Sequence, residues 1–182
     1  VVVNQNGSQD ADVMKYEFTQ ISEERFYDTV DLKKFKDDEP EAILEFVKKQ
    51  MRLIPFGDFL KRYIYERARF LCRFEEVEQT EYQEIILDSF KDNDAPKSFR
   101  ETSAKLSALA KNWLTQSSVN REVVFLLGFG LHMTVNDVSE FLTKALRERD
   151  FNFRDPFEVI CWYCYKNGFQ YAKMDQLMRE YE

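Results

Sequence analysis

Residues 121–146 read REVVFLLGFGLHMTVNDVSEFLTKAL, and this stretch decides the fold class. Its part from 123 to 131 is so apolar that a helix there keeps almost no polar face, and such a helix must be buried on all sides. Thr134 and Asp137 then stand at capping-box spacing ahead of an apolar repeat that begins at Val138, which predicts the start of another helix. The stretch therefore predicts two consecutive helices of a helical core.

The same periodicity recurs on both sides of this stretch. Apolar residues at intervals of three and four predict further helices over residues 39–51, 56–71, 78–91, 98–115, 155–167 and 171–181. We expect an all-α, compact multi-helix bundle of about seven or eight helices. Residues 39–182 would form this single helical domain, after a flexible tail and N-terminal arm over residues 1–38. Its core is expected to contain Trp113, Phe125, Phe141 and Ile160, because each lies on the apolar face of its own helix.

The composition favours helices over strands. The chain has 182 residues, 44% of them hydrophobic, with only 5 glycines and 4 prolines, which are too few turn residues for a β-sandwich. Three cysteines cannot build a disulfide framework, and with one histidine they offer no convincing zinc site. No segment reaches the ~18 apolar residues that cross a bilayer. We expect a cytoplasmic protein with no membrane association.

Residue types that support catalysis are either missing or better explained by packing. The single histidine, His132, follows the most apolar helix and is expected to be a partly buried structural residue. Cys161 and Cys164 have the spacing of a redox pair, but they lie inside a predicted helix, so we expect them in the core. Gly128 and Gly130 lack the residues of a phosphate loop and indicate close helix packing or a helix end. We predict no catalytic residues, no metal site and no cofactor, and hence a protein that is not an enzyme.

Charge is distributed unevenly along the chain. Its 26 basic and 33 acidic side chains give a formal net charge of −7. Residues 96–122 hold five basic and two acidic side chains, a local charge of +3, so the rest of the chain carries −10. This balance argues against a surface that coats nucleic acid everywhere, but it is compatible with one local basic face.

A helix over residues 98–115 would separate apolar from basic side chains. Phe99 and Trp113 fall on the apolar face, and the opposite face would hold cations with Ala104 and Ala108 between them. Small alanines let cations approach a phosphate backbone closely. The candidate DNA-binding residues combine cations with polar side chains that could reach base edges: Lys97, Arg100, Lys105, Ser107, Lys111, Asn112 and Arg121. The alternative for this helix is an ordinary solvated face.

Several short motifs follow one another in a characteristic order. They are a Phe-Gly-x-x-Leu step at Phe56, Gly57 and Leu60, a Ser-Arg-apolar step at Ser118, Arg121 and Val124, a capped helix at Met133, Thr134, Asp137 and Val138, and an Asp-Pro helix start at Asp155. Over residues 56–168 this order resembles the phage-repressor-like helix-turn-helix family of bacterial transcriptional regulators, in a divergent form. The resemblance implies a helix-turn-helix-like core in which residues 98–115 take the place of the recognition helix. The stretch 69–96 is longer than the tight turn of that family.

Two functions from different classes remain. The first is a non-enzymatic regulator that places the helix near Lys97 to Lys111 on double-stranded DNA, as a homodimer because one such module contacts a single half-site. The second is an acidic helical module that binds another protein, for instance an inhibitor of a nucleic-acid-handling enzyme of the anti-CRISPR type, where negative charge competes for basic channels. The surface charge around residues 97–111 discriminates between them.

Overall fold

The computed structural model describes residues 40–50 and 54–182, and it divides the chain into two units, Val1–Ile54 and Pro55–Glu182. In the first unit the helix α3 (Pro40–Gln50) forms where the sequence predicts it, with Glu41 in its first turn and Leu44 exposed. The expected arm over residues 1–38 lies outside the described residues. The candidate site belongs to the second unit.

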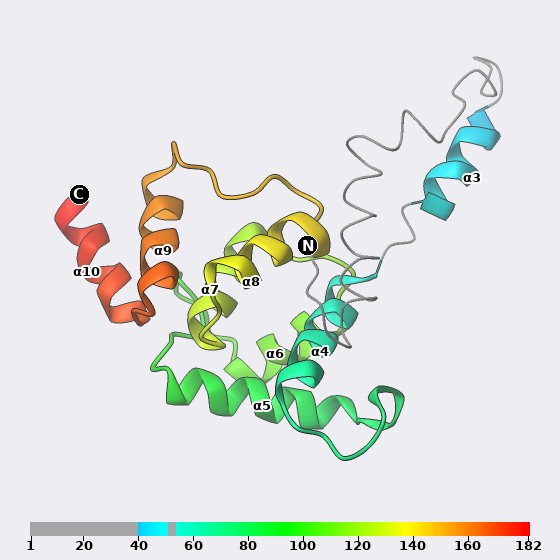
Figure 1. Cartoon of the computed structure of the whole chain (residues 1–182), viewed down its shortest axis with the longest axis horizontal. Coiled ribbons are helices and arrows are strands. Elements are labelled where there is room, and N and C mark those ends of the chain that lie inside the picture. Colours follow the sequence, from blue (N-terminus) through cyan, green and yellow to red (C-terminus); the bar gives the residue numbers. More distant parts are fainter. Residues whose placement is uncertain (1–39, 51–53) are drawn as a thin grey trace. The chain divides into compact units, whose positions relative to one another are not determined.

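The second unit is built from helices alone in its described residues (Figure 1). Its elements are α4 (Phe56–Arg67), a 3-10 turn (Phe74–Glu76), α5 (Gln79–Asp92), α6 (Leu106–Thr115), α7 (Arg121–Gly130), α8 (Val135–Glu140), a π-helical turn (Phe141–Ala145), α9 (Pro156–Asn167) and α10 (Tyr171–Tyr181). The helices α4, α5 and α6 pack together, α7 contacts α5, α8 and α9, and α10 lies along α9. With α3, the described residues form eight α-helices, so the predicted all-α fold is confirmed.

The helix α7 lies at the centre of this unit and is buried from Val124 to Gly130, as its missing polar face predicts. A Cβ atom added at Gly128 would come within 2.6 Å of the Tyr165 ring, and one added at Gly130 would collide with the ring of Phe90. Both glycines therefore permit close packing, which is one of the two interpretations that the sequence left open.

Local capping signals begin and end the C-terminal helices as predicted. The Thr134 hydroxyl accepts the Asp137 N–H, and the Asp137 carboxylate accepts the Thr134 N–H in return. Asp155 caps α9 through the Phe157 N–H, and Gly168 ends it in the left-handed region with φ 68°. These helix boundaries need no long-range contact to form, which is why the sequence shows them.

The predicted core is confirmed at three of its four positions. Phe141 is packed edge-on against aromatic rings of α4, Phe125 lies among rings of α9 and the preceding loop, and Trp113 stacks on α5; all three side chains are buried. Ile160 is only half-buried. The prediction for Ile160 is wrong because α9 turns Cys161, Cys164 and Tyr165 inward instead, so that Ile160 lies at the edge of the buried face.

The residues considered for catalysis separate into buried and exposed ones. Cys161 and Cys164 are buried and unbridged, as expected for core residues. His132 is exposed, so its predicted partial burial is wrong; it follows the end of α7 with φ 52°, where the chain turns toward α8. Such a turn points the imidazole outward, away from the apolar helix that precedes it.

Candidate nucleic-acid interface

The C-terminal end of α6 is held by the start of α4. The Phe56 N–H donates to the Ser117 carbonyl at 2.8 Å, and the Gly57 N–H donates to the Gln116 carbonyl at 2.9 Å. A Cβ atom at Gly57 would collide with the Leu114 carbonyl, so only glycine allows the two backbones to approach this closely. The Phe-Gly step of the sequence therefore positions α6.

The other side of α6 is held by α5. The Gln83 side-chain amide donates to the Ser107 carbonyl at 2.9 Å, and the Trp113 ring stacks on Phe90 with centroids 5.7 Å apart. Ala110, Trp113 and Leu114 are the buried residues of α6. A helix fixed on two sides presents its remaining face in one defined orientation.

That remaining face, which we call the α6 outer face, consists of exposed residues only: Lys105, Ala108, Lys111, Asn112 and Thr115. Lys105 precedes the first turn, and the other four follow at helical intervals opposite the buried residues. No acidic residue occurs in α6. The α6 outer face thus combines two ammonium groups with a small residue at its middle and an amide beside it.

The predicted helix over residues 98–115 is too long at its N-terminal end, because α6 begins at Leu106. The Ser98 hydroxyl accepts the Arg100 N–H and the Thr102 hydroxyl accepts the Ala104 N–H, so these side chains form local turns in place of helical hydrogen bonds. Residues 96–105 are therefore a loop, and the predicted helical row of cations that includes Lys97 and Arg100 does not form.

Long-range contacts also hold this loop. The Phe99 ring packs against Phe157 of α9, with centroids 5.4 Å apart, and stacks on Tyr171 of α10 at 5.9 Å. Because these two partners lie far along the chain, the local sequence pattern does not reveal them. The apolar spacing of Phe99 therefore predicted a helical face instead.

The two candidate cations Lys97 and Arg100, both in the loop 96–105, have partners within the protein. The Lys97 ammonium donates to the Ala104 carbonyl at 2.8 Å, and the Arg100 guanidinium pairs with Glu122 at 3.0 Å. Both side chains are exposed, and such surface pairs contribute little to stability. They nevertheless make Lys97 and Arg100 less available to phosphates than Lys105 and Lys111.

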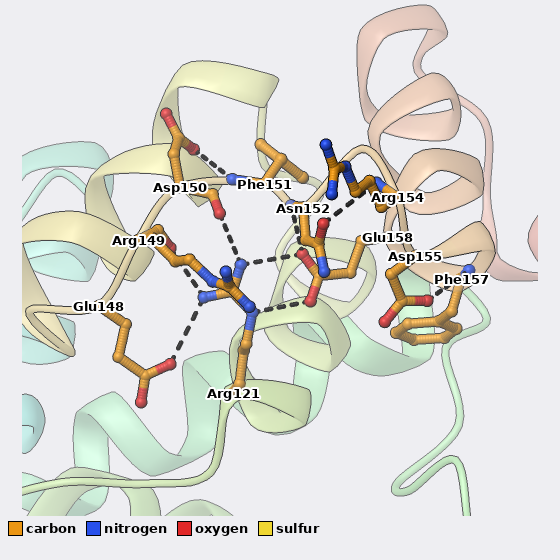
Figure 2. A network of polar contacts seen from close by, with 10 residues as sticks. All are labelled: Arg121, Glu148, Arg149, Asp150, Phe151, Asn152, Arg154, Asp155, Phe157 and Glu158. Carbon is orange, nitrogen blue, oxygen red and sulfur yellow. Dashed lines mark hydrogen bonds and ion pairs between the residues drawn. The ribbon is translucent and has the colours of Figure 1, made fainter.

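Arg121 is the candidate most deeply involved in the fold (Figure 2). Its Nε and Nη2 donate to the two oxygens of Glu158 at 2.7 and 2.9 Å, and its remaining N–H groups reach the carbonyls of Arg149 and Asp150 and the carboxylate of Glu148. Arg121 therefore ties α7 to α9 and to the loop between the π-helical turn and α9. A guanidinium used in this way has no donor left for a phosphate, so Arg121 is no longer a candidate for a DNA contact.

The charge of this pair is stabilised by its hydrogen bonds. Burial of Glu158 by itself would raise the pKa of the carboxyl group, but hydrogen bonds from Arg121 and from the Asn152 N–H outweigh it and lower that pKa. The hydrogen bond to Glu158 raises the pKa of Arg121 in turn. Both residues stay charged at neutral pH, and Arg121 acts as a structural residue.

Ser107, the remaining candidate, lies half-buried on the side of α6 that faces α5. The structure thus brings Lys105, Lys111 and Asn112 together on the α6 outer face and separates the other four candidates from it. Arg100, Ser107 and Arg121 are held by residues distant in the sequence, whereas Lys97 contacts a carbonyl of its own loop.

A groove beside α6, which the sequence did not predict, extends the α6 outer face. It has a volume of about 420 Å³ and lies between α6, the loop 116–120 and the start of α7. Asn112 lines both the groove and the α6 outer face. The other lining residues are a mixture of apolar and polar ones: Leu109, Trp113, Gln116, Ser118, Val119, Asn120 and Val123. The only signal in the sequence is the run of polar residues that breaks the helical pattern there.

Acidic side chains gather on α5, opposite its buried residues Tyr82, Ile86 and Phe90. They form what we call the α5 acidic stripe, which is exposed along its length and consists of Glu78, Glu81, Glu84, Asp88 and Asp92. Because Gln83 faces α6, the stripe points away from the α6 outer face. The two charge types are separated in space as well as in sequence.

No family model, curated protein or solved structure matches this chain. Among the described residues there is no group of three or more histidine, cysteine, aspartate or glutamate side chains that could hold a metal ion. Within the same part of the chain, no helix has the length and apolar character needed to span a membrane.

Proposed function

We propose that the unit Pro55–Glu182 binds double-stranded DNA as a non-enzymatic regulator of the helix-turn-helix type, with α6 in the major groove. The observation that carries this proposal is the α6 outer face, which is exposed, free of acidic residues and held rigidly from two sides. An α-helix fits the major groove, and a small residue such as Ala108 at the middle of its face allows close approach.

The residues of the α6 outer face divide into two roles. Lys105 and Lys111 would contact phosphates, which fixes the position of the helix without reading sequence. Asn112 would read a base edge, since an asparagine amide can pair with both N6 and N7 of adenine. We expect the protein to act in the cytoplasm, where its three free cysteines remain reduced.

The likeness to phage-repressor-like regulators supports this assignment through two contacts. The Phe56-Gly57 step seats α4 against the end of α6, and the Ser118-Arg121 step begins the buried helix α7. The connection between α5 and α6, residues 93–105, is longer than the tight turn of that family. The proposal therefore depends on α6 itself and assigns no DNA contact to α5.

A fluorescence anisotropy titration with mixed genomic fragments at low salt tests the proposal. We expect Lys105→Glu and Lys111→Glu each to weaken binding at least about ten-fold, because a repulsive charge then faces the phosphates. Lys91→Glu is the matched control: it makes the same charge change on an exposed position of α5 and should have little effect. No binding at micromolar protein, or equal effects of all three changes, would reject the proposal.

One observation favours the second function, an acidic module that binds another protein or inhibits a nucleic-acid-handling enzyme. The α5 acidic stripe presents five exposed carboxylates in a row, which is the arrangement expected of a surface that occupies a basic channel. If the DNA titration is negative, the stripe becomes the surface to test, and charge reversal at Glu81 and Asp88 is the appropriate change.

A further inference from the structure

The outward side of α9 is a second helical face without a described partner. We call it the α9 outer face; it consists of Asp155, Val159, Trp162, Tyr163 and Lys166. Tyr163 and Lys166 are exposed and the other three are half-buried, on the side of the helix away from the buried Cys161 and Cys164. Tyr163 is 42% exposed, so it is accessible to a partner.

Two further exposed rings widen this face. Phe153, 60% exposed, meets the edge of Trp162 at a centroid distance of 5.5 Å, and Phe169 lies 5.7 Å from Tyr163. The Lys166 ammonium lies 4.9 Å from the centre of the Trp162 ring. The result is an aromatic patch of two ring pairs on one helix and its flanks, and exposed apolar patches mark surfaces that bind another macromolecule.

The order of charges along α9 indicates which partner fits. An acid, Asp155, stands at one end of the face, a base, Lys166, stands at the other end, and apolar residues lie between them. If a second α9 packs antiparallel, the Asp155 of one copy faces the Lys166 of the other, and the Val159 of one faces the Trp162 of the other. Both pairs have the same midpoint, between Ile160 and Cys161, so one two-fold axis satisfies them together.

We propose that a second copy of this chain occupies the α9 outer face, with the two α9 helices antiparallel across a two-fold axis. A two-fold interface uses the same patch on both copies and must be self-complementary, which the α9 outer face is in both charge and apolar character. This dimer would present two α6 outer faces to DNA, but its formation does not depend on DNA binding.

Sedimentation equilibrium of the full chain without DNA tests the dimer. We expect a dimer whose dissociation constant rises about ten-fold or more in Tyr163→Glu, because a carboxylate then enters the apolar part of the interface. Lys91→Glu is the control for a charge change elsewhere, and circular dichroism verifies that both variants keep their helix content. A monomer at about 0.1 mM protein, or a dimer unaffected by Tyr163→Glu, would overturn the proposal.

A charge exchange tests the antiparallel register. Lys166→Glu should weaken the dimer, because two carboxylates then face each other at both ends of the interface. Adding Asp155→Asn should recover part of the lost affinity, since asparagine removes one of those charges and still caps α9. If Asp155→Asn gives no recovery in the Lys166→Glu background, the register is wrong.

Binding of single-stranded oligonucleotides by a chain that stays monomeric would assign the aromatic patch to nucleic-acid stacking and overturn the proposal as well.

Discussion

Arg121 shows how far a single residue can differ from what its type suggests. A basic residue in a basic stretch indicates a phosphate contact, yet all of its N–H groups are used by Glu158, Glu148 and two backbone carbonyls. Glu158 is only 6% exposed and accepts the Asn152 N–H as well. The pair therefore joins α7, α9 and the loop that precedes α9.

We predict that Glu158→Gln destabilises the protein in a pH-dependent way. The carboxyl pKa is lower in the folded protein than its ordinary value of 4.5, so the ionic contribution is present above that value and is lost as the pH falls through the folded-state pKa. The loss should be about 1.5–3 kcal/mol at pH 7, typical of hydrogen bonds to charged groups, and should shrink in acid. Urea denaturation at pH 7 and at an acidic pH measures this loss of stability. An equal loss at the two pH values would contradict an ionic role for Glu158.

Core truncations test the buried rings. Phe125→Ala and Phe141→Ala each remove a fully buried ring from an aromatic cluster, so each should lower the free energy of unfolding by ~3–5 kcal/mol. Ile160→Ala is the comparison, because its half-buried side chain should cost distinctly less. Chemical denaturation that shows a loss below about 1 kcal/mol for both rings would place them at the surface.

At the scale of elements, the glycines of α7 allow neighbouring helices to pack closely against it. Alanine is normally the better helix residue by about 1 kcal/mol, which would favour substitution of either glycine. At Gly130 the added Cβ would collide with Phe90, a fully buried side chain of α5 that cannot move aside without disturbing Trp113. Overpacking therefore outweighs helix propensity at this position.

We predict that Gly130→Ala destabilises the protein by about 1–3 kcal/mol. Phe90→Leu should compensate in part, because the smaller side chain makes room for the new Cβ, so the double variant should be more stable than the sum of the single losses predicts. Equilibrium denaturation of the four proteins in this cycle measures the coupling. Simple additivity would mean that the two positions do not meet.

For α6 we predict that Asn112→Ala relaxes DNA sequence preference. Loss of a base-edge contact should cost ~1–3 kcal/mol on the preferred site and leave non-specific binding nearly unchanged. Competition between preferred and mixed DNA separates the two effects. An equal loss on all sequences would assign Asn112 to the backbone.

At the scale of the whole molecule, net charge and local charge have opposite signs. The chain carries −7, with the α5 acidic stripe exposed, while the α6 outer face carries only basic charge. If the α6 outer face contacts DNA as proposed, we expect measurable affinity at low salt only, because the acidic remainder opposes binding and each phosphate contact weakens as the salt concentration rises.

We predict that the salt dependence of DNA binding identifies the phosphate contacts. Lys105→Ala and Lys111→Ala should each flatten the slope of log affinity against log salt by about one unit, since each removes one phosphate contact. Arg100→Ala should change the slope little, because Arg100 is paired with Glu122. A larger change at Arg100 than at the two lysines would place the interface around Arg100 instead of on the α6 outer face.

The sequence by itself determined the fold class and most helix boundaries of this protein. Thr134 with Asp137 and Asp155 with Gly168 start or end their helices through contacts of a few residues, and the apolar run of α7 requires burial wherever it lies. It also showed that positive charge is concentrated around residues 96–122. Capping residues and apolar runs are local signals, and the concentration of positive charge follows from counting residues, so all three are visible without the tertiary structure.

Only the tertiary structure decided which residues share a surface. Phe99 packs the loop 96–105 against α9 and α10. Glu158 binds Arg121, which therefore does not join the α6 outer face. Phe56 and Gly57 of α4 hold the end of α6. These partners are separated by tens of residues, and their energies depend on distances of a few ångströms. Periodicity along the chain carries no information about such distances, which is why the face of α6 was predicted in part and the face of α9 was not predicted at all.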